Sequence, residues 1–372
     1  MLMGACSRMR SKTWRYACVL ALAAFAVARA GSAAAAEKIV VGASTPGGFS
    51  ETTVSLLYAK TMGYFAQEGL DVSFVSFQTG AVLLPQVVTK QVDFGWATPG
   101  TLIIGKQPGR DPLPLKMVYN WIRSSNYDFA VLANSPYHTL ADLKGKKIGI
   151  THLGSGNIPQ TVAALRDAGL EPGRDVFLIS ITQSPSPVFV ALSTGQVDAV
   201  NMTDGVDIEL ENRGLKIRRL PWKEKFAGLF GAGFFTHEDT IRERGDMVGR
   251  FGRALTKGII ACEANVPACI QAMWKYDPAS KRSNIPEAQA LADAVRIAKA
   301  RFKILFSFLS GAPKNFGEFP AETWKNYINV LADAGQLKTR DISLDSLYTN
   351  RFVAAYNNFD VEAVRRQAQA LK

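Results

Sequence analysis

The sequence predicts an α/β protein of two lobes, with mostly parallel sheets, a ligand cleft between the lobes and helices toward the C-terminal end. The first observation is an internal repeat, in which residues 87–100 read VVTKQVDFGWATPG and residues 192–205 read LSTGQVDAVNMTDG. In both copies Gln-Val-Asp opens a short apolar strand that runs into a loop of small polar residues. The second observation is that strands alternate with helices at a spacing typical of parallel sheets covered on both faces.

The repeat extends upstream to the first full strand of each lobe. Residues 39–44 read IVVGAS and residues 147–151 read KIGIT, and each is an apolar strand that leads into a polar, Gly-rich loop and a helix. In both lobes a similar length of chain separates this strand from the Gln-Val-Asp segment. Two lobes of similar build whose strands end in such loops favour a small-molecule site in the cleft between them.

Apolar runs bounded by Gly and Pro predict the elements of the first lobe. In order, these are strand 38–43, helix 50–62 closed by Gly63, strand 71–77, helix 80–90, strand 92–97, helix 99–106 and strand 115–121. The second lobe follows a crossing strand at 127–132. Its elements are strand 147–150, a helix that Asn157 caps and Gly169 ends, strand 175–181, helix 186–195, strand 197–202 and strand 215–220.

The chain then returns to the first lobe. Residues 226–235, FAGLFGAGFF, are uncharged and mostly apolar, and they predict a buried strand. Nearly everything after residue 246 is predicted to be helical. The longest of these helices covers 285–309, with Asn284 and Glu287 as a capping pair. The remaining predicted helices are 320–334 and 345–371.

These elements predict a discontinuous first lobe. Residues 1–36 are predicted to be a signal peptide, residues 37–127 together with 231–372 the first lobe, and residues 128–230 the second lobe. Because the chain crosses twice between the lobes, the crossings are predicted to form a hinge.

The first residues carry the signals of an exported protein. Four basic residues come first, and residues 17–28 form an apolar run that is too short to span a bilayer. Ala34 and Ala36 then fit the small-residue rule for cleavage before Glu37. An uncleaved N-terminal membrane anchor is the alternative.

The composition gives no support to nucleic-acid binding. The formal charge of +11 includes five basic residues in the leader and falls to +6 without them. The remaining Lys and Arg residues are scattered and do not alternate with aromatic residues in a dense run. A hydrophobic content of 47% and a charged content of 20% are ordinary for a soluble globular protein. We expect a monomer, because the sequence shows no evident apolar interface.

Two cysteines, Cys262 and Cys269, remain once the leader is removed. An export route makes a disulfide between them favourable, although seven residues of straight helix would hold the sulfurs too far apart. Pro267 lies between them and predicts a helix break that brings them together. Two free buried thiols are the alternative. No His or further Cys lies nearby, so no metal site and no cofactor are predicted.

Candidate ligand contacts follow from the rule that ligands bind beyond the carboxyl ends of strands in open α/β sheets. The residues selected are Ser44, Thr45, Gly48, Phe49, Gln78, Thr79, Trp96 and Thr98 in the first lobe and Thr151, Gly154, Ser155, Gln183, Asn201 and Asp204 in the second. Backbone N–H groups at the helix starts that follow these loops favour an anion or a carbonyl or sulfonyl oxygen. The alternatives are that the Ser and Thr residues only cap helices and that Trp96 belongs to the core.

The charge of the ligand stays open at this point. No candidate loop contains an arginine, although Arg123 closely follows the fourth strand. A fully charged anion is often bound by an arginine fork, and an amine by a carboxylate such as that of Asp204.

Residues 63–72, GYFAQEGLDV, and 140–149, LADLKGKKIG, resemble signature segments of periplasmic binding proteins. Both Gln-Val-Asp segments also resemble a recurring position of the SsuA/THI5-like (NMT1-like) group, which takes up nitrate, sulfonates, taurine and thiamine pyrimidines. The resemblance implies a two-lobed, type II-like fold. It also implies a periplasmic receptor that closes on a small solute and delivers it to an ABC permease and ATPase at the inner membrane.

Two other functions remain as alternatives. One is an enzyme on the same fold that acts on a small organic acid, and the other is a ligand-binding component of a sensor. The resemblance favours a protein that is not an enzyme, because this chain lacks the cysteine-rich motif of the fungal pyrimidine-forming enzymes. No catalytic residue is predicted.

Overall fold

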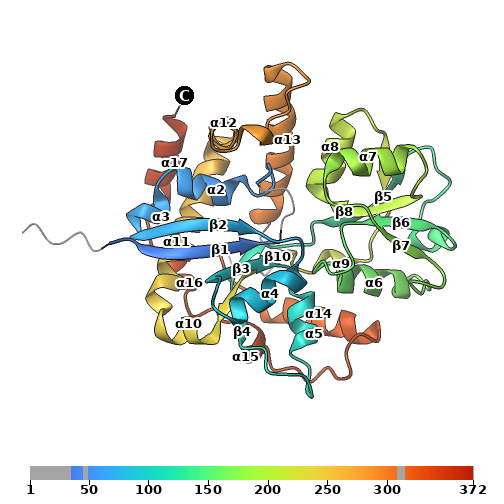
Figure 1. Cartoon of the computed structure of the whole chain (residues 1–372), viewed down its shortest axis with the longest axis horizontal. Coiled ribbons are helices and arrows are strands. Elements are labelled where there is room, and N and C mark those ends of the chain that lie inside the picture. The colour runs from blue at the N-terminus through green and yellow to red at the C-terminus, as the bar shows by residue number, and fades with distance from the viewer. Residues whose placement is uncertain (1–34, 45–48, 308–314, 372) are drawn as a thin grey trace, which may run out of the picture. The chain divides into compact units, whose positions relative to one another are not determined.

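The strands in the described part of the chain form two five-stranded sheets (Figure 1). The computed structural model describes residues 35–44, 49–307 and 315–371. The chain divides into a segment Met1–Glu37 and a compact unit Lys38–Lys372. The second unit carries both sheets apart from Glu37, which is the first residue of the first strand. The predicted signal peptide lies almost wholly outside the described residues.

The first sheet has the strand order β2-β1-β3-β10-β4. Its strands are β1 (Glu37–Ala43), β2 (Leu70–Ser76), β3 (Phe94–Ala97), β4 (Leu115–Ile122) and β10 (Ala232–His237). Strand β1 runs parallel to β3, with Val41 opposite Phe94, whereas β10 runs antiparallel to both β3 and β4. The central strand β3 is entirely buried, which matches its apolar sequence.

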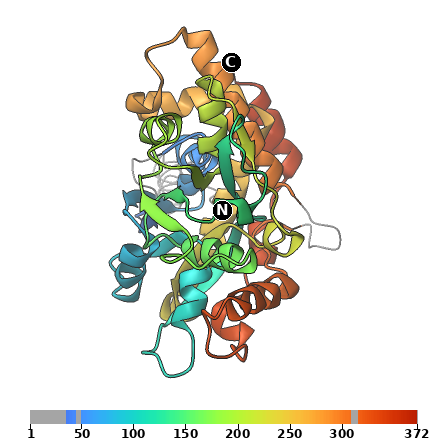
Figure 2. The same ribbon diagram turned by 90° about the vertical axis from the view of Figure 1, so that its right-hand side faces the viewer.

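The second sheet has the strand order β7-β6-β8-β5-β9. Its strands are β5 (Tyr127–Leu132), β6 (Lys147–Ile150), β7 (Phe177–Ser180), β8 (Ala199–Thr203) and β9 (Ile217–Arg219). Strand β6 is parallel to β7 and β8, and β5 is antiparallel to β8 and β9. Figure 2 views the molecule from the right-hand side of Figure 1, so that the green strands and helices of this second sheet lie in front of the blue elements.

In each sheet one strand pairs antiparallel to its neighbours, which agrees with the mostly parallel sheets predicted from the sequence. These strands are β5, with which the chain enters the second sheet, and β10, with which it returns to the first. Each enters the middle of its sheet from the end opposite to that used by its βαβ neighbours, so it pairs antiparallel.

The internal repeat has an equivalent structure in both sheets. Asp93 accepts a hydrogen bond from the backbone N–H of Val40 at 2.8 Å, and Asp198 accepts one from Lys147 at 2.9 Å. The backbone N–H of each aspartate returns the bond to the same partner's carbonyl. The repeated aspartates therefore tie the start of the first full strand to the turn before the third, at the end away from the loops that were predicted to bind ligand.

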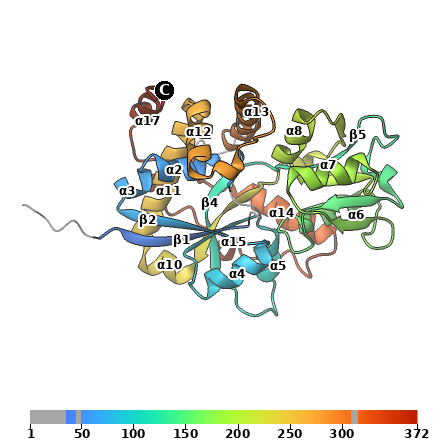
Figure 3. The ribbon, with the colours of Figure 1, turned by 45° about the horizontal axis from the view of Figure 1, so that its top comes forward.

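Helices cover both faces of the first sheet. On one side lie α2 (Val54–Thr61), α3 (Tyr64–Gln67), α11 (Gly245–Ala264) and α12 (Val266–Tyr276), and on the other α4 (Gly80–Val88) and α5 (Gly100–Gly105) (Figure 3). The ring of Phe251 in α11 stacks on Phe94 of β3, with centroids 4.1 Å apart. This contact anchors α11 to the middle of the sheet.

The second sheet is covered by α6 (Ile158–Asp167) on one side and by α7 (Pro185–Ser193) and α8 (Asp204–Asn212) on the other. The remaining helices are α9 (Glu224–Ala227), α10 (Glu238–Glu243), α13 (Glu287–Leu305), α14 (Ala321–Asp333), α15 (Leu344–Leu347), α16 (Val353–Tyr356) and α17 (Val361–Gln369). Within the described ranges, no helix is both long and apolar enough to cross a membrane.

Three predictions for the second half of the chain need correction. Residues 226–235 are not one strand, because α9 occupies their start and β10 begins only at Ala232. Helix α13 has Pro286 at its N-cap rather than Asn284, and Glu287 pairs with Lys281 at 2.9 Å instead of capping. The helix predicted over 345–371 is three short helices, because Tyr348 has an extended backbone and Asp360 caps α17 as a new start.

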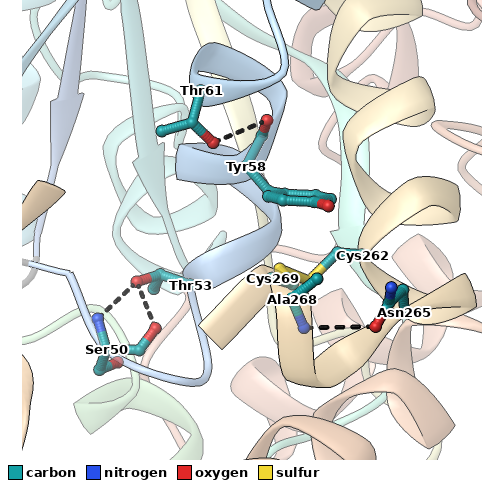
Figure 4. Close-up of a disulfide and its surroundings, with 8 residues drawn as sticks. All are labelled: Ser50, Thr53, Tyr58, Thr61, Cys262, Asn265, Ala268 and Cys269. Atoms are coloured by element: carbon teal, nitrogen blue, oxygen red, sulfur yellow. Dashed lines mark hydrogen bonds between the residues drawn. A yellow bond between two sulfur atoms is a disulfide. The ribbon is translucent and has the colours of Figure 1, made fainter. Parts of the chain in front are cut away.

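Cys262 at the end of α11 and Cys269 in α12 form a disulfide, with their Cα atoms 5.2 Å apart (Figure 4). The helix break lies at Asn265, whose side chain accepts a hydrogen bond from the backbone N–H of Ala268 at 3.3 Å. Both cysteines are fully buried next to α2. The disulfide therefore joins the two helices on which α2 packs.

Candidate functional site

A cavity of about 750 Å³ opens at the carboxyl ends of strands from both sheets. The last residues of β3, β7 and β8 line it, and so do Ser44 and Thr151, which directly follow β1 and β6. Its volume is typical of sites for small organic ligands. The cavity is where the strand-end rule placed a ligand.

Nine of the predicted contacts line the cavity. They are Ser44, Phe49, Gln78, Thr79, Trp96, Thr98, Thr151, Ser155 and Gln183. Thr45 and Gly48 lie outside the described residues. The structure thus brings together loops that are far apart in the sequence, and a role of these residues in ligand binding stays a prediction.

The first sheet contributes an aromatic wall. Trp96 is nine-tenths buried and packs edge-on against Trp121, with centroids 4.8 Å apart. Its indole N–H has no hydrogen-bond partner among the described residues. Phe49 lies edge-on to Phe74 at 5.0 Å. Trp96 therefore belongs both to the core and to the cavity wall, which combines the two alternatives considered from the sequence.

Hydroxyl groups of the first sheet hold their own loops in place. Ser44 donates to the carbonyl of Trp96 at 3.1 Å. Thr79 accepts a hydrogen bond from the backbone N–H of Val82 at 3.4 Å and so caps α4. The helix-capping alternative is thus correct for Thr79, although the residue also lines the cavity.

The second sheet supplies a loop of polar residues that is bonded internally. The Thr151 hydroxyl donates to Ser155 at 2.8 Å, and the backbone N–H of Gly154 donates to His152 Nδ1 at 2.9 Å. A Cβ atom at Gly156 would overlap the Thr98 hydroxyl of the first sheet. Glycine at this position therefore lets the two strand-end loops touch.

Three predicted contacts, Gly154, Asn201 and Asp204, are not among the lining residues. Gly154 lies in the lining loop, but its backbone is turned to His152. Asn201 is fully buried because α6 covers it: its Oδ1 accepts from Thr161 at 2.6 Å and from Asn157 at 3.3 Å. Its amide donates to the carbonyl of Asp128, so its hydrogen bonds are made within the second sheet and its helix.

Asp204 forms an ion pair with Arg301 of α13, and this arginine lines the cavity in its place. The Asp204 side chain is at the start of α8, where the helix dipole favours a carboxylate. In this structure Asp204 therefore pairs with Arg301 of the cavity wall and does not line the cavity itself.

Sequence reasoning missed the charged side chains of the cavity. They are Glu51, Glu209, Arg213, Lys281, Arg282 and Arg301. Glu51 lies just before α2, and the other five lie on α8, on α13 or in the segments next to them rather than in a strand-end loop. No signal in the sequence ties α13 to the cleft, because its polar face is also what a solvent-exposed helix would show.

Arg123, by contrast, is directed away from the cavity. Its guanidinium donates to the carbonyl of Asn315 and lies over the ring of Phe316. It is nevertheless well buried, and burial lowers its pKa from the ordinary value. Arg123, which follows the fourth strand in the sequence, thus contacts Asn315 and Phe316 and is not among the residues that line the cavity.

Several polar side chains of the cavity already have hydrogen-bond partners. Ser44 donates to the carbonyl of Trp96, Thr151 donates to Ser155, the Gln183 amide donates to Thr203, and His152 Nδ1 accepts from Gly154. In the described part of the chain, no three His, Cys, Asp or Glu residues lie close enough together to hold a metal ion. The arrangement suits reversible binding of a polar solute with a flat part.

Comparison with known sequences places the chain in a family. The family model described as NMT1/THI5 like matches residues 51–267, which is more than half of the chain. The chain belongs to the NMT1/THI5-like family. This membership confirms the resemblance seen in the two signature segments and in the repeated Gln-Val-Asp.

Individual relatives of this NMT1/THI5-like chain are distant. A putative binding protein from Brucella abortus is 29% identical over 171 residues, which are 46% of this chain and 50% of the relative. The chain thus spans about half the length of the curated relatives it matches first. The riboflavin-binding protein RibY from Chloroflexus aurantiacus is 23% identical over 300 residues, 79% of this chain and 80% of RibY.

Solved structures show the same fold. The alkanesulfonate-binding protein SsuA from Xanthomonas axonopodis pv. citri, bound to MOPS, superposes with a TM-score of 0.61. It is 20% identical, and the match covers 84% of this chain and 98% of SsuA. The two-lobed periplasmic-binding-protein fold predicted from the sequence is therefore confirmed.

Proposed function

We propose that this protein is the solute-binding component of an ABC import system and that it captures a small organic or oxyanionic solute. The observation that carries the proposal is the cavity itself: loops from both sheets line it, and it has the size of a small-molecule site. Relatives named as binding proteins support it.

Binding by closure is part of the proposal. Residues 37–127 with 231–372 would form one lobe and residues 128–230 the other. A solute that contacts Trp96 on one side and Thr151 on the other favours the closed arrangement, since it gains contacts that the open form cannot offer.

The proposal also includes the cellular location of the protein, which follows from the predicted signal peptide. Residues 1–36 would direct export to the periplasm and be removed there. The receptor would then act as a monomer that meets a permease and an ATPase at the inner membrane.

A thermal-shift screen of the purified protein tests the binding role. After unfolding and refolding to remove co-purified solute, the protein is screened against sulfonates, nitrate, pyrimidines, flavins, carboxylates and amino acids. A ligand at about 100 times its dissociation constant adds about 2.7 kcal/mol of stability, which shifts the melting temperature by several degrees. We expect a hit that is recovered chemically unchanged after incubation.

Two results would count against the proposal. A hit that is consumed during incubation would show an enzyme on this fold. Identical small-angle scattering dimensions with and without a tight ligand would rule out closure of the lobes.

A further inference from the structure

The cationic side chains of the cavity are already paired with carboxylates. Arg213 lies 2.9 Å from Glu209, and Arg282 lies 2.9 Å from Asp293. In the same way, Arg301 is paired with Asp204, and Lys281 is paired with Glu287. A guanidinium that is already neutralised attracts an anionic solute less than a free one does.

Glu51 is the exception among the charged groups of the cavity. It makes no hydrogen bond or ion pair to the side chain of another residue within the described ranges. The residues around it are fixed, because the backbone N–H of Ser50 donates to the Thr53 hydroxyl at 3.0 Å where α2 begins (Figure 4). Glu51 thus lines the cavity with a carboxyl group that is hydrogen-bonded to its own backbone N–H and has no side-chain partner.

The surroundings of Glu51 do not supply that partner. Burial raises the pKa of Glu51 to about 7, and the nearby carboxylate of Glu209 acts in the same direction. The attraction of Arg282 is too weak to reverse this shift, since Arg282 is shared with Glu209 and Asp293. A partly buried carboxyl group at a cavity wall, without a side-chain partner, is stabilised by any solute that brings a hydrogen-bond donor or a positive charge to it.

We propose that Glu51 makes the cavity selective for flat solutes that carry a cationic or hydrogen-bond-donating group, such as an amidine or an amino-heterocycle, over oxyanions. The inference rests on the proposed solute-binding function and narrows its ligand class. Trp96 and Phe49 place aromatic rings in the cavity wall, against which a planar ring can pack, and Glu51 supplies the acceptor. An anion in the same place would lose its hydration next to the carboxyl groups of Glu51 and Glu209, and no unpaired cation would compensate for this loss.

A matched set of aromatic probes tests the selectivity. Benzamidine, benzoate and benzenesulfonate share a flat ring and differ in the charge of the attached group, and 4-aminopyrimidine adds a neutral donor. Dissociation constants are measured by calorimetry at about pH 8, where Glu51 is largely ionised. We expect benzamidine and 4-aminopyrimidine to bind at least about tenfold more tightly than the two anions.

Substitution of the carboxyl group separates its effect from that of the cavity as a whole. Glu51→Gln is expected to weaken benzamidine binding about tenfold or more and to narrow or reverse the preference over benzoate. Glu322→Gln is the matched control, since Glu322 is exposed on α14 and pairs only with Lys325. It should leave all four dissociation constants unchanged.

The pH profile provides a second readout. Benzamidine binding should weaken from about pH 8 to about pH 6 in the wild type, because protonation removes the charge of Glu51. Glu209 and Arg282 face Glu51, and His152 also lines the cavity. All three remain in Glu51→Gln, so a profile that flattens in this variant assigns the effect to Glu51.

Several outcomes would overturn the inference. Tighter binding of the anions, an unchanged benzamidine affinity in Glu51→Gln, or failure of both donor probes to bind would each do so. The proposed function would still stand in these cases if the wider screen finds a solute. Unfolding of the ligand-free variant checks its integrity, and we expect no loss of stability, because the substitution removes a partly buried carboxyl group that has no side-chain partner.

Discussion

Arg301 of α13 and Asp204 of α8 form an ion pair that joins the C-terminal helices to the second sheet's helices. Both side chains are largely buried, with 4% and 14% of their surfaces exposed. The two helices lie beside each other (Figures 1 and 3), and Arg296 of α13 is also paired with Glu211 of α8. Under the proposed lobe boundaries, α8 and α13 belong to different lobes, so these pairs link the lobes at the edge of the cavity.

Asp204→Asn should destabilise the protein by about 3 kcal/mol, because it leaves the buried guanidinium of Arg301 without its counter-charge. Urea unfolding of the wild type and the variant measures this difference. Asp246→Asn is the control: Asp246 is 87% exposed in its pair with Arg250, and its removal should change the stability by less than about 1 kcal/mol.

A double substitution tests whether the charge itself is responsible. Asp204→Leu combined with Arg301→Met should be close to the wild type in stability, because neither partner is then left buried and charged. An Asp204→Asn variant as stable as Asp246→Asn would show that the pair is dispensable.

Glu51 should make the stability depend on pH. Burial raises the pKa of its carboxyl group from 4.5 to about 7, so the folded protein binds the proton more tightly than the unfolded chain does. The resulting stabilisation is present in full below about pH 4.5 and is lost as the pH rises through about 7. The difference in unfolding free energy between wild type and Glu51→Gln should therefore change by about 3 kcal/mol over this range.

Urea unfolding at several pH values from about 4.5 to 8 checks this sign and size. The comparison with Glu51→Gln removes the contributions of all other titrating groups. A difference that stays constant over the range would mean that the carboxyl group titrates normally in the folded protein.

Removal of the disulfide between Cys262 and Cys269 should lower the stability by about 2 to 3 kcal/mol, as expected for a short closed loop. The variant Cys262→Ala with Cys269→Ala keeps the buried position apolar. Both cysteines are fully buried, so a reducing agent should act on the native protein slowly and on the unfolded chain at once. Wild type and variant are compared in urea, with and without the reducing agent.

Gly156→Ala should weaken both folding and solute binding, because its Cβ atom would overlap the Thr98 hydroxyl. We expect a loss of about 1 to 3 kcal/mol in unfolding free energy, the usual effect of overpacking. Thr98→Ala in the same chain should recover part of the loss. Gly154→Ala is the control, since the nearest atom to its Cβ, His152 Nδ1, would be 3.3 Å away and the loss should be smaller.

Periodic features were predictable from the sequence because they depend on local order. The alternation of strands and helices, the repeated Gln-Val-Asp and the Gly-rich loops each require only neighbouring residues. Asp93 and Asp198 show this well: they occupy the same place in the two Gln-Val-Asp segments, and they accept equivalent hydrogen bonds from the backbone N–H groups of Val40 and Lys147. The loops at the strand ends were therefore found correctly.

The errors arose where a residue's partner is distant in the chain. Asn201 follows the pattern of a strand-end contact, but α6 covers it and its bonds point inward. The helix predicted over 345–371 fails because Tyr348 pairs with Met117 of β4 and takes an extended backbone. Tertiary contacts override local propensity in both cases.

The sequence alone determined the fold class and the loops that surround the cavity, because hydrophobic periodicity and turn residues specify them locally. The family followed from the resemblance of residues 63–72, 140–149 and the repeated Gln-Val-Asp to known signature segments. Only the tertiary structure decided the charge of the cavity. Whether Asp204, Arg301 and Glu51 meet a ligand or one another depends on the packing of α13 against α8, two helices separated by more than 70 residues. Electrostatic energies depend on distance and burial in space, which no local pattern records.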